Sequence, residues 1–108
     1  MKLFVDDVRA VPKGWELART NTEAIRLLAS GQVKEISLDH DIMAGYWIYD
    51  NCEYKLVDGI SEETYQPVAY YISLMLFKPK VIFHTGNFDA GKNMAEIIGC
   101  EYIRNDDI

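Results

Sequence analysis

The sequence predicts an α/β fold with a mostly parallel sheet of about four to five strands and helices on both faces. Two observations favour this class. Short apolar runs that end in polar residues alternate along the chain with helical patterns. The 108 residues can also bury a core without disulfide staples, and they contain no repeats or linkers. We therefore expect a single domain over residues 1–108.

The N-terminal part predicts two strands and the clearest helix. Residues 2–7, "KLFVDD", are a short apolar run closed by two acids, which indicates a buried strand. Residues 15–20, "WELART", predict a second strand, and the link between the two is too short for a full crossover helix. The helix follows over residues 20–31, where Thr20 and Glu23 are spaced as a capping box.

The central part repeats the first pattern and then loses it. Residues 35–41, "EISLDHD", predict a strand that ends in acids. Residues 43–60 have no clean period and several turn signals, so we expect a loop with an embedded short strand or hairpin. Residues 64–77 predict a helix, in which Pro67 fits only near the start, where its missing N–H has no partner to lose.

The C-terminal part predicts a strand over residues 80–84, a helix over 89–99 capped by Asp89, and a last strand over 100–106. In a parallel sheet, ligands bind beyond the carboxyl ends of the strands. This rule gathers three groups at one edge, although they are far apart in sequence: Asp6 with Asp7, Asp39 with His40 and Asp41, and His84 with Thr85.

Carboxylates dominate that edge. Asp6, Asp7, Asp39 and Asp41 would repel one another unless they were protonated or bound to a cation. Hard oxygen ligands suit Mg²⁺, with Mn²⁺ as the alternative, and leave coordination positions for water and phosphate. The competing interpretation is that these aspartates cap loops and helices, as aspartates often do.

The neighbouring histidines and arginine have functional and structural interpretations. His40 alternates with its flanking acids, so it should point to the other face and pack against a helix. His84 ends its strand and can act as general acid or base, hold a phosphate, or be structural. Arg9 can clamp a phosphate or simply pair with Asp6 or Asp7.

Residues 86–92 match G-x-x-x-x-G-K, the pattern of a P-loop. A working P-loop needs Ser or Thr after its lysine and a later acidic strand, whereas this chain has Asn93 followed by 15 residues. We expect instead an anion-binding strand-to-helix turn, with Gly91 and Lys92 on the first turn of the helix.

The composition argues against several classes of protein. The net charge of -6 and the pI of about 4.8 disfavour nonspecific binding to DNA or to an anionic membrane. No apolar run approaches the roughly 18 residues of a membrane span. Two cysteines suggest no disulfide framework. We therefore expect a cytoplasmic protein without membrane contact.

Three blocks of the sequence carry a family resemblance. They are "LFVDDVRAVPKGWELART" (3–20), "EAIRLLASGQVKEISLDHDI" (23–42) and "HTGNFDAGKNM" (84–94). With these blocks the chain resembles a receiver domain, the flavodoxin-like fold of bacterial response regulators, and more closely the divergent cyclic-phosphate processing receiver family. The resemblance implies a site that acts on phosphates of nucleotides or RNA ends.

The resemblance assigns roles by position. It implies that Asp6 and Asp7 hold magnesium, that Asp39 falls on the phospho-accepting aspartate, and that Thr85 falls on the hydroxyl residue that senses the phosphoryl group. Further positions that match the divergent family are Arg9, His40, Asp41, His84 and Asn87. The last predicted strand offers Arg104 where an ordinary receiver has a lysine, which argues against two-component signalling.

Together these observations predict a Mg²⁺- or Mn²⁺-dependent site that binds or processes a cyclic phosphate of a nucleotide or RNA end. The expected metal ligands are Asp6, Asp7 and Asp39, the catalytic candidates Asp39, Asp41 and His84, and the phosphate ligands Arg9, Thr85, Asn87 and Lys92. The alternative is a non-catalytic pseudo-receiver that binds nucleotide or a protein partner through its aromatic region, residues 46–71. A phosphorylatable receiver is a third possibility.

Overall fold

The computed structural model describes residues 1–42, 45–50, 53–58 and 64–106. Along the chain the elements are β1 (Lys2–Val5), β2 (Glu16–Ala18), α1 (Asn21–Ala29), β3 (Glu35–Leu38), β4 (Gly45–Asp50), β5 (Glu53–Asp58), α2 (Gln66–Ser73), β6 (Lys80–Phe83) and α3 (Phe88–Ile98). None of the helices in the described part of the chain combines the length and the hydropathy that crossing a bilayer requires.

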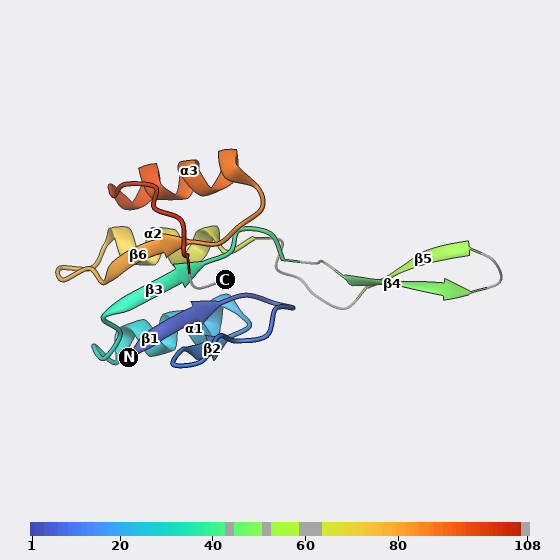
Figure 1. Ribbon diagram of the computed structural model, residues 1–108, viewed down its shortest axis with the longest axis horizontal. Coiled ribbons are helices and arrows are strands. Elements are labelled where there is room, and N and C mark those ends of the chain that lie inside the picture. The colour runs from blue at the N-terminus through green and yellow to red at the C-terminus, as the bar shows by residue number, and fades with distance from the viewer. Residues whose placement is uncertain (43–44, 51–52, 59–63, 107–108) are drawn as a thin grey trace.

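Four strands form one sheet in the order β2-β1-β3-β6, and all three neighbouring pairs are parallel. Figure 1 shows them side by side, with the helices packed against them. The register aligns Val5 with Leu38 and Leu38 with Phe83, so the last residues of β1, β3 and β6 lie in one row. The predicted receiver-like parallel sheet is confirmed, and its carboxyl ends meet at one edge.

The helices of the described residues pack on one face of this sheet. Their buried side chains share a core with alternate strand residues, which are Leu3, Val5, Ile36, Leu38, Val81 and Phe83. The strand residues that point the other way, Phe4 and Ile82, form a second cluster with Trp15. Continuous apolar strands fit a sheet that is buried on both sides.

The direction of the connections explains this one-sided arrangement. The steps from β2 through α1 to β3 and from β3 through α2 to β6 move the same way across the sheet. Right-handed crossovers therefore place these helices on the same face. Only the step from β1 to β2 runs the other way, and it is made by residues 6–15, which contain no helix. The expected helices on both faces are thus not found in the described residues.

The first helix begins and ends as predicted. The Thr20 hydroxyl accepts a hydrogen bond from the backbone N–H of Glu23 at 3.1 Å, and the Glu23 carboxylate accepts one from the N–H of Arg19 at 3.1 Å. The pair caps the helix N-terminus reciprocally, with the glutamate reaching one residue further back than in a standard capping box. Gly31 follows with a φ of 77°, in the left-handed region that favours glycine.

The other two helices differ from their predicted bounds. Helix α2 has Pro67 in its first turn, as predicted, but it ends at Ser73. The apolar residues Leu76 and Phe77 lie beyond that end and are 93% and 89% exposed. Helix α3 begins at Phe88, and its cap is Asn87, whose side chain accepts a hydrogen bond from the Ala90 N–H. The predicted cap at Asp89 is therefore wrong.

The predicted last strand is reduced to one bridge. Residues 103–105 run parallel to β6, where Phe83 donates to Ile103 O and Asn105 donates to Phe83 O, both at 2.8 Å. This bridge extends the sheet beyond β6 and carries Asn105 into a buried position.

Residues 43–60, for which we expected a loop with a short strand or a hairpin, contain a hairpin. Strands β4 and β5 pair antiparallel and project away from the sheet (Figure 1). A bridge between Asp41 and Thr64 joins the two chain segments at the base of this projection. Residues 43–44, 51–52 and 59–63 and the aromatic side chains of β4 and β5 lie outside the described part of the structure.

Candidate functional site

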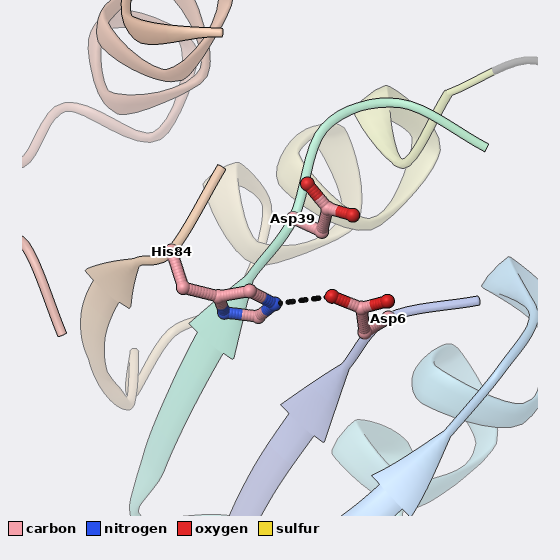
Figure 2. Close-up of side chains that lie close together, drawn as sticks. All are labelled: Asp6, Asp39 and His84. Carbon is pink, nitrogen blue, oxygen red and sulfur yellow. Dashed lines mark hydrogen bonds and ion pairs between the residues drawn. The ribbon is translucent and has the colours of Figure 1, made fainter. Parts of the chain in front are cut away.

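Three side chains converge just beyond the carboxyl ends of β1, β3 and β6. Asp6, Asp39 and His84 each follow the last residue of their strand, and Figure 2 shows them close together, with His84 facing Asp6. The backbone ladder continues through this row, because Asp39 donates to Val5 O at 3.1 Å and His84 to Leu38 O at 3.0 Å. One potential ligand atom from each lies within 4.8 Å of the others. Two carboxylates and an imidazole therefore lie within reach of one another at this edge of the sheet.

His84 is fully buried and held on several sides. Its Nε2 lies 2.9 Å from Asp6 Oδ2, and its Nδ1 lies 2.7 Å from Ser37 Oγ (Figure 2 shows the Asp6 contact). Asn105 donates a hydrogen bond to the same Ser37 oxygen at 2.9 Å. The Phe4 ring stacks on the imidazole with centroids 4.1 Å apart. These contacts hold the ring in one orientation, and each of its two nitrogens has a hydrogen-bond partner.

Asp6 is the anchor of the site. Its side chain is completely buried, and Oδ1 accepts hydrogen bonds from the backbone N–H groups of Val8 and Arg9, both at 2.9 Å. Arg9 Nε lies 3.6 Å from Oδ2. Burial alone would raise the pKa of Asp6, but the hydrogen bonds from His84, Arg9 and Val8 outweigh it and lower the pKa to about 2. Asp6 is therefore a stable buried anion.

Asp39 has the opposite electrostatic setting. It is half-buried, and burial raises its pKa; the nearby charges of Asp6 and Asp7 raise it further. A hydrogen bond of 2.8 Å from the His40 N–H to Asp39 Oδ1 offsets part of this effect. The local charge thus disfavours an ionised Asp39 unless a cation lies beside it.

A cavity of about 670 Å³ opens in front of these groups. Its polar lining comes from most of the residues that the sequence singles out: Asp7, Arg9, Asp39, Asp41, Thr85 and Asn87. Asp6 and His84 lie behind this lining. Lys92 is exposed on α3 and does not belong to the lining residues of the described chain.

His40 is buried, and its Nδ1 lies 2.7 Å from Asp41 Oδ1. This contact orients a carboxylate that is itself 64% exposed and lines the cavity. The expectation that His40 points away from the acids assumed that the strand continues, but β3 ends at Leu38. The His40 ring instead reaches the adjacent Asp41.

The G-x-x-x-x-G-K segment does not form a phosphate-wrapping loop. Gly91 and Lys92 lie inside α3, and the Gly91 N–H already donates to Asn87 O at 3.0 Å. A Cβ on Gly91 would come within 2.7 Å of the Tyr102 ring and 2.9 Å of the Thr85 methyl group. This glycine therefore permits close packing between α3 and its neighbours.

Sequence reasoning missed Ser37 and Asn105, the buried polar residues that hold His84. A signal existed for Ser37, because a hydroxyl between Ile36 and Leu38 in an apolar strand requires a hydrogen-bond partner. No comparable signal marked Asn105, whose contact with Ser37 spans 68 residues of sequence.

No curated protein and no solved structure is significantly similar to the chain. The family model of the cyclic-phosphate processing receiver domain matches residues 1–99, which include every strand-end residue described above. The parallel sheet and the acidic site at its carboxyl edge agree with that match. The chain belongs to the cyclic-phosphate processing receiver domain family.

Proposed function

We propose that the carboxyl-edge cavity binds one divalent metal ion and a phosphate group of a nucleotide or RNA end, and that it processes a cyclic phosphate. The observation that carries this proposal is the convergence of Asp6, Asp39 and His84 within 4.8 Å behind an open cavity. Three chain segments place potential metal ligands there, and the cavity in front offers room for a ligand.

The donor set fits a divalent metal. Asp39 belongs both to the metal-ligand group and to the cavity lining, so it links a bound ion to a ligand in the cavity. Burial, together with the charges of Asp6 and Asp7, raises its pKa, and a cation beside it would favour the ionised carboxylate. Carboxylate oxygens suit Mg²⁺, and they also suit Mn²⁺. When bound, the ion would neutralise phosphate charge and acidify a bound water.

Arg9 is the natural phosphate ligand of the cavity. Its side chain is 46% exposed, while its backbone N–H is fixed by Asp6. Its carbonyl accepts a hydrogen bond from Arg19 Nη1 at 2.9 Å, which further holds the loop. A guanidinium presents two parallel donors to phosphate oxygens. Thr85 and Asn87 line the opposite side of the cavity.

For hydrolysis of a cyclic phosphate, Asp41 is the candidate base. It faces the cavity and is oriented by His40. It would take a proton from water as the water oxygen bonds to phosphorus. The bond from phosphorus to one ring oxygen breaks, that oxygen takes up a proton from solvent, and Asp41 then releases its proton to solvent. In this step Asp39 would hold the metal ion; attack by Asp39 itself in place of water is a separate, alternative route. We assign His84 a positioning role through Asp6, because it is buried behind the cavity rather than lining it.

The test is a titration of a nucleoside 2′,3′-cyclic phosphate into the purified protein with Mg²⁺, with Mn²⁺ and with a chelator, while phosphorus NMR follows turnover. Binding that requires the metal and disappears in Asp39→Asn supports the proposal. Glu16→Gln, an exposed acid at the start of β2, is the matched control. Binding that ignores both the chelator and Asp39→Asn would contradict it.

A second candidate is a module that binds another protein. The projecting β4–β5 hairpin favours it, because a two-stranded hairpin alone is marginally stable in water. Its sequence carries Tyr46, Trp47, Tyr49 and Tyr54, and Tyr70 on α2 is 55% exposed. Replacement of residues 45–58 by a short Gly-Ser linker tests it. Loss of a partner with retained phosphate binding would support this role.

A further inference from the structure

Two exposed apolar side chains stand in the wall of an otherwise polar cavity. Val8, in the loop after β1, is 64% exposed, and Phe88, the first residue of α3, is 55% exposed. Both line the cavity that Arg9 and the aspartates occupy. A phenyl ring neither ligates a metal ion nor donates a hydrogen bond to phosphate, so the proposed phosphate and metal chemistry does not explain Phe88 at this position.

We propose that Phe88 is the platform on which the base of a nucleotide ligand stacks while its phosphate lies against Arg9 and Asp39. The inference rests on the proposed function, and it deepens it by distinguishing a nucleotide from a base-free phosphate ester. An aromatic face gains from stacking with any base, so it favours nucleotides without selecting one sequence.

The Phe88 ring is already held in place. The guanidinium carbon of Arg104 lies over it, 5.2 Å from the ring centroid. The same guanidinium donates a hydrogen bond to the carbonyl oxygen of Thr85. Asn87, the residue before Phe88, caps the helix that begins there. Its backbone N–H also donates a hydrogen bond to Thr85 Oγ1 at 3.0 Å. A preorganised ring loses little conformational freedom when a ligand stacks on it.

The cavity wall also indicates which ligands gain nothing from it. A sugar phosphate or inorganic phosphate presents hydroxyls and charged oxygens, which a phenyl ring cannot satisfy. A purine has the larger surface to stack, so purine nucleotides should bind better than pyrimidine nucleotides.

The experiment compares two ligands on three proteins and a control variant by calorimetry with Mn²⁺ present. The ligands are adenosine 2′,3′-cyclic phosphate and glycerol cyclic phosphate, which lacks a base. The proteins are the wild type, Phe88→Ala and Phe88→Trp. Phe77→Ala, an exposed phenylalanine far from this cavity in the loop after α2, is the control for loss of an exposed ring.

We expect Phe88→Ala to weaken adenosine 2′,3′-cyclic phosphate about ten-fold and to leave glycerol cyclic phosphate unchanged. Phe88→Trp should restore the difference between the ligands, and Phe77→Ala should keep it. Unchanged nucleotide affinity in Phe88→Ala overturns the inference but leaves the proposed function intact. Equal losses for both ligands also overturn it, because the ring would then support the phosphate site rather than a base. Failure of both ligands to bind the wild type overturns both proposals.

Discussion

The sheet has a cavity at each end, and the two differ in what lines them. The carboxyl-edge cavity, about 670 Å³, is lined by aspartates, Arg9, Thr85 and Asn87. The other cavity, about 490 Å³, lies between the end of α1 and the loop after α2 and is lined mainly by apolar residues, among them Leu28, Val33 and Met75. Its charged residues are Lys34 and Lys78, which are exposed. The volumes of the two cavities alone would not show which one is the functional site.

The two cavities differ in whether a charged side chain is buried beside them. Asp6 is completely buried at the first cavity, with hydrogen bonds from three directions. Burying an ion is unfavourable unless neighbouring groups stabilise it, so such an arrangement marks a site whose geometry matters. At the second cavity, by contrast, apolar packing accounts for the lining. The predictions below contrast these two ends, from the largest expected effect to the smallest.

The largest effect should come from Asp39→Asn, which removes the carboxylate shared by the metal group and the cavity. We expect at least a ~100-fold loss of Mn²⁺ affinity by calorimetry, because a neutral amide gives up the charge that attracts the ion. Lys34→Ala at the opposite cavity should leave Mn²⁺ affinity unchanged. Equal Mn²⁺ affinity in Asp39→Asn and the wild type would contradict a metal site at the carboxyl-edge cavity.

His84→Ala should destabilise the fold more than an apolar truncation at the other end. It leaves Asp6 and Ser37 buried without their shared partner, and such losses cost about 3–5 kcal/mol. Urea unfolding measures the change. Met75→Ala, in the half-buried lining of the second cavity, should cost less. The comparison fails if the two variants lose the same stability.

The lowered pKa of Asp6 predicts acid sensitivity. Because its folded pKa is about 2 and its unperturbed value is 3.8, Asp6 stabilises the fold above pH 3.8. That contribution, about 2 kcal/mol, is lost as the pH falls through 3.8 toward 2. Urea unfolding at pH 6 and at pH 2.5 should show a smaller pH difference in Asp6→Asn than in the wild type. An identical difference would mean that another group carries the acid sensitivity.

The smallest effect should come from Lys92→Ala. Lys92 is exposed and lies outside the cavity lining, so its removal should change phosphate affinity less than two-fold. Arg9→Ala should weaken the same ligand by ten-fold or more, the scale of a charge-assisted contact. Lys78→Ala at the second cavity serves as the baseline for a surface cation. If Lys92→Ala lost as much phosphate affinity as Arg9→Ala, the phosphate would bind at α3 rather than beside Arg9.

Local sequence signals predicted much of the fold and of the site. Hydrophobic periodicity located β1, β3 and β6, and the edge rule placed Asp6, Asp39 and His84 together although 78 residues separate the outer two. Thr20 and Glu23 predicted the start of α1, because capping depends on residues within one turn.

Features that depend on tertiary contacts escaped prediction. The apolar residues after Ser73 continued the helical pattern, yet the chain leaves α2 there. The sequence placed His84 at the end of its strand, but its burial depends on Phe4, Ser37 and Asn105 from three other segments. Because Asp6 and Asp7 are adjacent, the sequence predicted the same metal-binding role for both. Of the two, only Asp6 is buried behind the cavity lining.

The most direct test of the central claim is a calorimetric titration of a nucleoside 2′,3′-cyclic phosphate into the wild type and Asp39→Asn, each with Mg²⁺ and with a chelator. We predict binding to the wild type with Mg²⁺, and its loss both with the chelator and in the variant. Wild-type binding of equal strength under all these conditions would contradict the account, because the ligand would then bind independently of the strand-end acids.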